Sequence, residues 1–193
     1  MKRLWYTSIC LLILSQIAIA DDNCPAEEFL KGRLEAVFAV LQNEDMAQQA
    51  KRDEIVEIVS PMFDFALMAK LSLGKKYWPG LSEENKEKFT DLFIKKLRTS
   101  YLSKLTLYTD EKIIYEPPVQ DKTKVRISTY LISKDKKIDM LYKFYYSANS
   151  WKIYDVEIQG VSIIRSYRSQ FDEIMQNGTI DELLLKLQES VDN

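Results

Sequence analysis

The chain has 193 residues with 27 basic and 29 acidic side chains, a net charge of −2 and no histidine. Without histidine, Ser-His-Asp triads, Cys-His pairs and histidine-ligated zinc are excluded, and the two cysteines, Cys10 and Cys24, form no CxxC motif. Acidic and basic residues are interspersed, so no long basic block indicates nucleic-acid binding.

The N-terminus predicts a secretory signal peptide over residues 1–20. Lys2 and Arg3 precede an uncharged apolar run from Leu4 to Ile17, and Ala18-Ile19-Ala20 forms a small-x-small cleavage site. This run is shorter than the roughly 20 residues that a membrane-spanning helix needs. We expect cleavage after Ala20 and export of a single domain over residues 21–193, with an uncleaved anchor as the alternative.

Export would leave the mature chain with one cysteine, Cys24, and therefore with no internal disulfide. Its stability must then come from packing. Five isolated glycines form neither a GxGxxG motif nor a phosphate-binding loop.

The first half of the mature chain predicts four helices. Apolar residues spaced by three and four predict the first around residues 30–41, and the second runs from about Ala47 to Val59. The third covers Phe63–Leu73 and ends at Gly74. The fourth begins at Ser82, and its apolar side continues over some 20 residues at Phe89, Phe93, Leu97, Tyr101, Leu105 and Tyr108.

Beyond Asp110 the pattern changes to strands, which are rich in β-branched and aromatic residues and separated by short polar turns. The four predicted strands are Lys112–Glu116, Thr123–Ser133, Lys137–Ser147 and Trp151–Gln159. In the third, apolar residues from Ile138 to Tyr146 alternate with Asp139, Leu141, Lys143 and Tyr145, which predicts one strongly apolar face. The short connections favour antiparallel pairing.

Two helices are predicted after the sheet, which Gly160 ends. The first carries Ile163, Ile164, Tyr167, Phe171 and Ile174 at helical spacing and is broken at Asn177-Gly178. A capping-box pattern from Thr179 to Glu182 starts the last helix. The whole order predicts an α+β fold in which helices pack on one face of a curved four-stranded antiparallel sheet. Such layers either close into a solid core or enclose a cavity, and composition does not separate these outcomes.

Two segments resemble the toluene-tolerance family, the MlaC-like phospholipid carriers of Mla-type transport systems in the bacterial periplasm. The first contains Pro61-Met62-Phe63-Asp64-Phe65, Met68-Ala69, Leu73-Gly74 and Trp78. The second contains Trp151-Lys152-Ile153-Tyr154-Asp155-Val156, Gly160-Val161-Ser162 and Tyr167-Arg168-Ser169-Gln170-Phe171. The resemblance covers most of the mature chain, except about its first 25 residues.

This resemblance implies a periplasmic carrier rather than an enzyme, with an apolar cavity between helices and sheet that encloses the acyl chains of a phospholipid. It implies no cofactor besides this cargo. The implied partners are an inner-membrane ABC transporter with an MCE-domain ring and an outer-membrane lipoprotein complex.

The apolar faces supply candidate lipid-binding residues: Phe93, Leu97, Tyr101, Leu105, Ile127, Met140, Tyr142, Phe144, Ile163 and Tyr167. Arg168 is a candidate contact for the lipid headgroup, and a bond to the end of the sheet is its structural alternative.

Other polar residues allow a structural and a chemical interpretation. Asp64 is either a helix cap or an acid catalyst, and we favour the cap. Tyr154 and Asp155 make either hydrogen bonds at a strand edge or an acid–base pair, and we favour the hydrogen bonds. Two other functions stay open: a small isomerase-like enzyme on a cone-shaped α+β fold that uses Tyr and Asp in an apolar pocket, and a partner-binding adaptor with a filled core.

Overall fold

The computed structural model describes residues 24–102, 112–133 and 136–192. The α-helices are α1 (Pro25–Gln42), α2 (Gln48–Val59), α3 (Phe65–Tyr77), α4 (Glu83–Leu97), α6 (Ile163–Asn177) and α7 (Ile180–Asp192). Short 3-10 helices, η1 (Ser60–Met62) and η2 (Trp78–Gly80), and a π-helix, η3 (Arg98–Leu102), connect them. The strands are β1 (Lys112–Tyr115), β2 (Val119–Asp121), β3 (Lys124–Ser133), β4 (Lys136–Ser147), β5 (Ser150–Ile158) and β6 (Val161–Ser162).

Side-chain caps fix the starts of three helices, although α3 begins at Phe65 and not at the predicted Phe63. Asp64 accepts a hydrogen bond from the backbone N–H of Leu67 at 2.8 Å, which confirms the structural interpretation of this residue. Ser82 caps α4 in the same way. At α7, Thr179 and Glu182 exchange side-chain to backbone hydrogen bonds of 3.3 and 3.2 Å, so the capping box is also confirmed.

Two predicted helix ends differ in detail. The third helix does not stop at Gly74: this residue forms a kink at φ 83°, and a further helical turn continues to Tyr77. The fourth helix ends as an α-helix at Leu97 and continues as η3. The sequence does not reveal this change, because a spacing of four between Leu97 and Tyr101 fits both an α-helix and a π-helix. Leu105 and Tyr108 lie outside the described residues.

The antiparallel sheet has the order β1-β3-β4-β5-β6, with β2 also paired to β3. All four predicted strands are present, but the predicted count of four was wrong, because β2 and β6 add two short strands. β1 and β2 pair with successive parts of β3 and are separated by Pro117 and Pro118, which have no N–H to donate to the ladder. β6 has two residues, too few for an alternating pattern.

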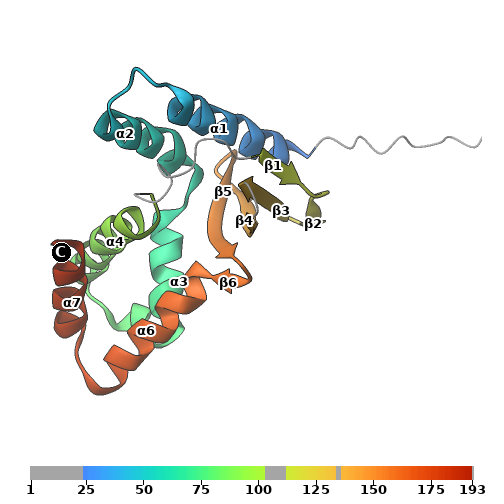
Figure 1. The fold of residues 1–193 in the computed structure, drawn as a ribbon. Coiled ribbons are helices and arrows are strands. Elements are labelled where there is room, and N and C mark those ends of the chain that lie inside the picture. Colours follow the sequence, from blue (N-terminus) through green and yellow to red (C-terminus); the bar gives the residue numbers. More distant parts are fainter. Residues whose placement is uncertain (1–23, 103–111, 134–135, 193) are drawn as a thin grey trace, which may run out of the picture.

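The helices wrap around one side of the curled sheet (Figure 1), as the sequence predicts. On β3 the residues that face the helices are Val125, Ile127 and Thr129, all at most 2% exposed, whereas Arg126 on the opposite face is exposed. Within the described residues, none of the helices combines the length and the apolar character that crossing a bilayer requires.

One part of the core is a solid aromatic cluster between α4 and α6. Phe89, Phe93, Tyr167 and Phe171 stack with ring centroids 5.1–6.0 Å apart, mostly edge to face. These rings pack directly against one another between the two helices, and none of them lines the cavity described below.

Candidate functional site

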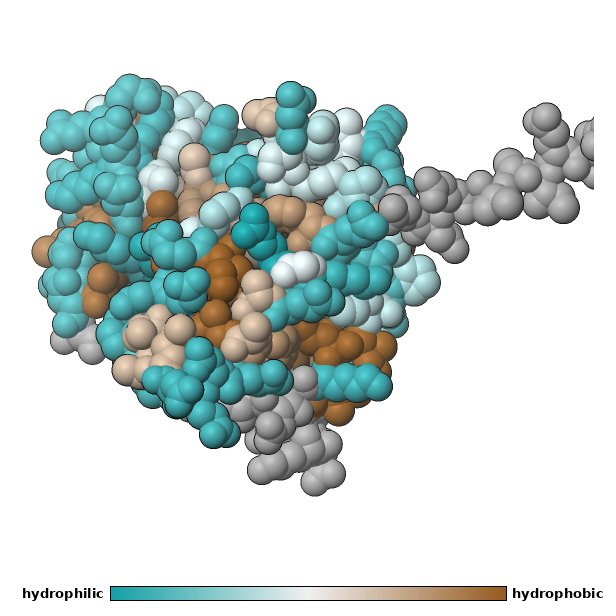
Figure 2. Space-filling view, turned by 90° about the horizontal axis from the view of Figure 1, so that it is seen from above, coloured by the Kyte–Doolittle hydropathy of each residue, from teal (hydrophilic) through white to brown (hydrophobic). Residues whose placement is uncertain are grey.

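An apolar cavity of about 410 Å³ lies between the sheet and the helices. Its volume falls within the range of roughly 300–1,000 Å³ that is usual for small-molecule sites. In the space-filling view (Figure 2), brown apolar surface lies inside a hollow bordered by hydrophilic residues. The cavity is therefore the first candidate for a functional site.

Three groups of residues form most of the cavity wall. Helix α1 contributes four side chains of its apolar face: Leu34, Val37, Phe38 and Leu41. The segment from η1 into α3 contributes Met62, Phe63, Phe65 and Met68. The sheet contributes Ile113, Thr129, Leu131, Ile138, Met140, Tyr142, Ile153, Val156 and Ile158.

The η1–α3 segment is attached directly to strand β5. The backbone N–H of Asp64 donates to the carbonyl of Ile153 at 3.0 Å, and Lys152 Nζ donates to the carbonyl of Pro61 at 2.6 Å. The hydroxyl of Tyr145 donates to the Asp64 carboxylate. These bonds hold Met62 and Phe63 against the edge of the cavity.

A β-bulge keeps β5 apolar toward the cavity. The register between β4 and β5 shifts between Lys143 and Phe144, so that Tyr154 is the extra residue. Regular alternation would turn either Ile153 or Val156 away from the cavity, because they are three residues apart. The bulge lets both line the wall.

The polar atoms of the wall are mostly hydroxyls. Burial raises the pKa of Tyr142 and, together with the nearby Tyr167, that of Tyr101. Both phenols therefore stay neutral well above physiological pH. Thr129 is the third hydroxyl, and Arg98 is the one charged side chain among the described residues that line the cavity.

Five of the candidate residues from the sequence lie together on the cavity wall: Leu97, Tyr101, Met140, Tyr142 and Ile163. Four others are buried in the core and do not line it. Phe93 and Tyr167 belong to the aromatic cluster. Ile127 and Phe144 lie on the face of the sheet that the helices cover, and they have no exposed surface. Leu105 lies outside the described residues, and lipid contact by any of the ten stays a prediction.

Arg168 does not line the cavity. Its Nε donates to the carbonyl of Leu71 at 2.9 Å, its Nη2 donates to the same oxygen, and the side chain lies against Gly74. The guanidinium thus satisfies a carbonyl beside the kink of α3. This bond differs from the sheet-end bond that the sequence suggested, and the headgroup contact stays a prediction.

The side chains of Tyr154 and Asp155 contact different groups and are not hydrogen-bonded to each other. Asp155 bonds the hydroxyl of Ser162, the backbone N–H of Ile164 and the ammonium of Lys143. Tyr154 packs edge to face on Tyr145 instead, with centroids 6.0 Å apart. Neither residue lines the cavity, so the structural interpretation of the pair is favoured.

The wall residues on α1, on η1–α3 and on β5 were all missed by sequence reasoning. A signal existed for α1, because Leu34, Val37 and Leu41 belong to its helical stripe. The apolar stripe does not distinguish a side chain that packs in the core from one that lines a cavity.

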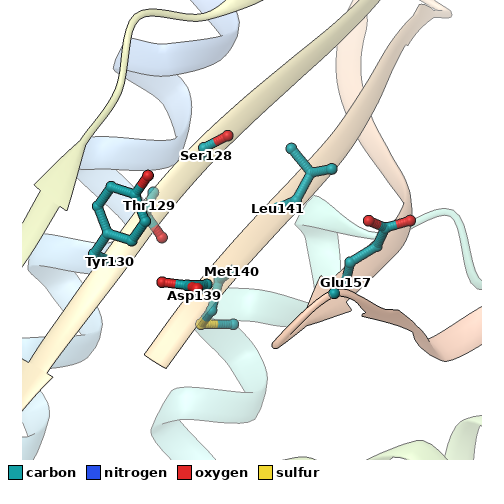
Figure 3. Close-up of a pocket in the computed structure, with 8 residues that line it drawn as sticks. Ser128, Thr129, Tyr130, Asp139, Met140, Leu141 and Glu157 are labelled. Carbon is teal, nitrogen blue, oxygen red and sulfur yellow. The ribbon is translucent and has the colours of Figure 1, made fainter. Parts of the chain in front are cut away.

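A second hollow of about 250 Å³ lies at β3, β4 and β5 (Figure 3). Asp139, Glu157 and Tyr130 are among its lining residues, so it offers carboxylates and a phenol rather than an apolar enclosure. Among the described residues, no group of three or more Cys, Asp or Glu side chains is arranged to hold a metal ion.

Comparison with known proteins gives a consistent result. The sequence model of the family described as MlaC protein matches residues 32–189. The intermembrane phospholipid transport system binding protein MlaC of Haemophilus influenzae is 28% identical over 120 residues, which are 59% of this chain and 56% of that protein. The chain thus matches little more than half the length of this relative.

A solved structure shares the fold. It is that of a phospholipid-binding protein from Ralstonia solanacearum in complex with a phospholipid, with a TM-score of 0.77. The match has 22% sequence identity and covers 86% of this chain and 97% of the other. An α+β architecture with a curled sheet is therefore confirmed for this chain.

Proposed function

This chain belongs to the MlaC family, and we propose that it is a periplasmic carrier that binds a phospholipid and moves it between membranes in an Mla-type transport system. The observation that carries the proposal is the cavity of about 410 Å³, whose described lining residues are uncharged except for Arg98. The names of the Haemophilus and Ralstonia proteins, a phospholipid transport binding protein and a phospholipid-binding protein, support the same cargo.

The energetics of the cargo explain why such a wall is needed. Each acyl methylene costs about 0.8 kcal/mol in water, so two chains of some 15 methylenes face a barrier of roughly 20 kcal/mol. A carrier lowers this barrier by giving the chains dry contact, and a wall with few polar anchors lets the lipid leave again. The neutral tyrosine and threonine hydroxyls add no charge that would demand water beside the chains.

The carrier would act in the periplasm after removal of residues 1–20. Its partners would be an inner-membrane ABC transporter with an MCE-domain ring and an outer-membrane lipoprotein complex. N-terminal sequencing of the exported protein tests the first part: the sequence should start at Asp21. A membrane-bound protein that retains Leu4 to Ile17 would contradict it.

An isomerase-like enzyme that uses Tyr and Asp would need both inside the cavity. Tyr101 and Tyr142 line it, but none of its described lining residues is a carboxylate, and Asp155 is held by Ser162, Ile164 and Lys143 instead. An adaptor with a filled core would have no cavity of this size. We therefore propose that the chain carries lipid without catalysis or cofactor.

Transfer of a fluorescent phospholipid between two vesicle populations tests the carrier function. Mature protein, present at far below the lipid concentration, should accelerate transfer over many turnovers. An adaptor would leave the rate at its spontaneous value. Thin-layer chromatography of the recovered lipid would reveal any chemical change, which a carrier does not make.

A further inference from the structure

The cavity of about 410 Å³ has one charged residue in its described wall, Arg98. The other lining residues are apolar or carry a single hydroxyl. A guanidinium is expensive to bury without a partner, and Arg98 avoids this cost because its side chain is exposed. A residue that both lines a cavity and reaches solvent stands at the cavity mouth.

Within the described part of the chain, most N–H donors of Arg98 are unused. Its Nη2 donates one long hydrogen bond, 3.4 Å, to the hydroxyl of Ser60 in η1, and no salt bridge joins it to a described carboxylate. A guanidinium has five N–H donors in a planar fork. Most of the fork is therefore free to bind an anion.

Arg98 lies where the α4–η3 segment meets the end of α2. It is the first residue of η3, directly after α4, and its bond to Ser60 crosses to the end of α2. Leu97 and Tyr101, its neighbours on this segment, line the cavity. An acyl chain that touches these residues would leave its polar end close to the guanidinium.

Arg168 offers the contrast. Its Nε and Nη2 both donate to the carbonyl of Leu71, so its fork is committed to the kink of α3. It is also absent from the cavity wall. Of the two arginines, only Arg98 combines free donors with access to the cavity.

We propose that Arg98 binds the phosphate of the phospholipid through its guanidinium while the acyl chains fill the cavity. This inference rests on the proposed carrier function and assigns its headgroup contact. Two parallel N–H donors of the planar guanidinium can bind two oxygens of one phosphate, which gives a short, charge-assisted bidentate contact. Arg98 would then fix the orientation of the lipid, with its chains inward and its headgroup at the mouth.

The test compares two lipids with the same chains, phosphatidylglycerol and diacylglycerol, which lacks the phosphate. Wild-type protein should bind phosphatidylglycerol roughly tenfold more tightly than diacylglycerol. This factor is near the lower end of the range for a hydrogen bond to a charged group, because salt screens the charges at the open mouth of the cavity. Arg98→Gln should bind both lipids equally and at the wild-type affinity for diacylglycerol. Arg98→Lys should keep part of the preference.

Arg126→Gln is the matched control, because Arg126 is an exposed arginine on the opposite face of the sheet. It should behave as wild type, and circular dichroism should show all variants folded. If Arg98→Gln keeps the full preference for phosphatidylglycerol, the assignment of Arg98 is wrong although the carrier function stands. If wild-type protein binds neither lipid, the carrier function itself fails.

Inorganic phosphate separates a lipid headgroup site from a site for the free anion. Phosphate alone at millimolar concentration should neither bind measurably nor displace phosphatidylglycerol, because it gains nothing from the apolar wall. Tight binding of phosphate that Arg98→Gln abolishes would overturn the proposal and identify a free-anion site instead.

Discussion

The hydroxyl of Ser162 lies 2.8 and 3.0 Å from the two carboxylate oxygens of Asp155, and it donates to them across the turn between β5 and β6. Asp155 also accepts the backbone N–H of Ile164 at 3.3 Å, and Ser162 accepts that of Arg165 at 3.1 Å. The first turn of α6 is thereby fixed to the sheet. Ile163, between these residues, is held in the cavity wall.

Replacing Asp155 by alanine should destabilise the protein strongly. The change leaves the Ser162 hydroxyl and the Ile164 N–H without their acceptor, and it leaves the Lys143 ammonium paired with Glu157 alone. We expect a loss of about 2–3 kcal/mol in the free energy of unfolding, measured in urea. Asp139→Ala is the control, since Asp139 is exposed and pairs with Lys137 at 3.4 Å; it should cost less than about 1 kcal/mol. Equal losses in the two variants would contradict this role of Asp155.

Two glycines should respond to alanine in opposite directions. Gly74 has φ 83° and ψ 171°, a region that is essentially restricted to glycine, so Gly74→Ala should cost about 1–3 kcal/mol. A Cβ there would lie 3.5 Å from Arg168 Nε, an ordinary contact, so the cost comes from the backbone. Gly32 lies inside α1 with open space around it, and Gly32→Ala should stabilise by about 0.5–1 kcal/mol. Thermal melting of both variants gives the answer, and a stable Gly74→Ala would refute the strain argument.

Alkaline pH should weaken the fold partly through Tyr115. Burial, with smaller contributions from Glu35 and Glu27, raises the pKa of Tyr115 from 10.0 to about 12. The folded state therefore keeps a proton that the unfolded state releases, so the stability from Tyr115 is complete below pH 10 and falls as the pH rises toward 12. Tyr115→Phe removes this titration, and its stability should fall less steeply over the same window. Parallel curves for the two proteins in urea unfolding would contradict the assignment.

The periodicity of the sequence predicts the helices and the long strands well, because it reports which face of an element is apolar. It also identifies the caps at Asp64, Ser82 and Thr179, which depend only on local hydrogen bonds. It does not detect β2 and β6, which are three and two residues long. It cannot see the change from α4 to η3, because Leu97 and Tyr101 keep a helical spacing.

The cavity is harder to predict than the fold. Phe93 and Leu97 lie on the same stripe of α4, yet Phe93 packs against Tyr167 and Phe171 while Leu97 lines the cavity. On β4, Tyr142 lines the cavity and Phe144 does not, although both face the helices. The difference depends on which helix lies opposite, and that is a property of the tertiary arrangement. Arg98 carries no sequence signal at all, because an arginine after an amphipathic helix is ordinary.

The most direct test of the central claim is native mass spectrometry of the exported protein. Wild-type protein should carry bound phospholipid, and Leu97→Glu and Met140→Lys should be empty while folded by circular dichroism, because a charge in the cavity wall demands water where the chains lie. Leu185→Glu is the control, since Leu185 is 59% exposed on α7, and it should stay loaded. A wild-type protein without lipid, or a folded Leu97→Glu that is loaded as fully as Leu185→Glu, would contradict the account.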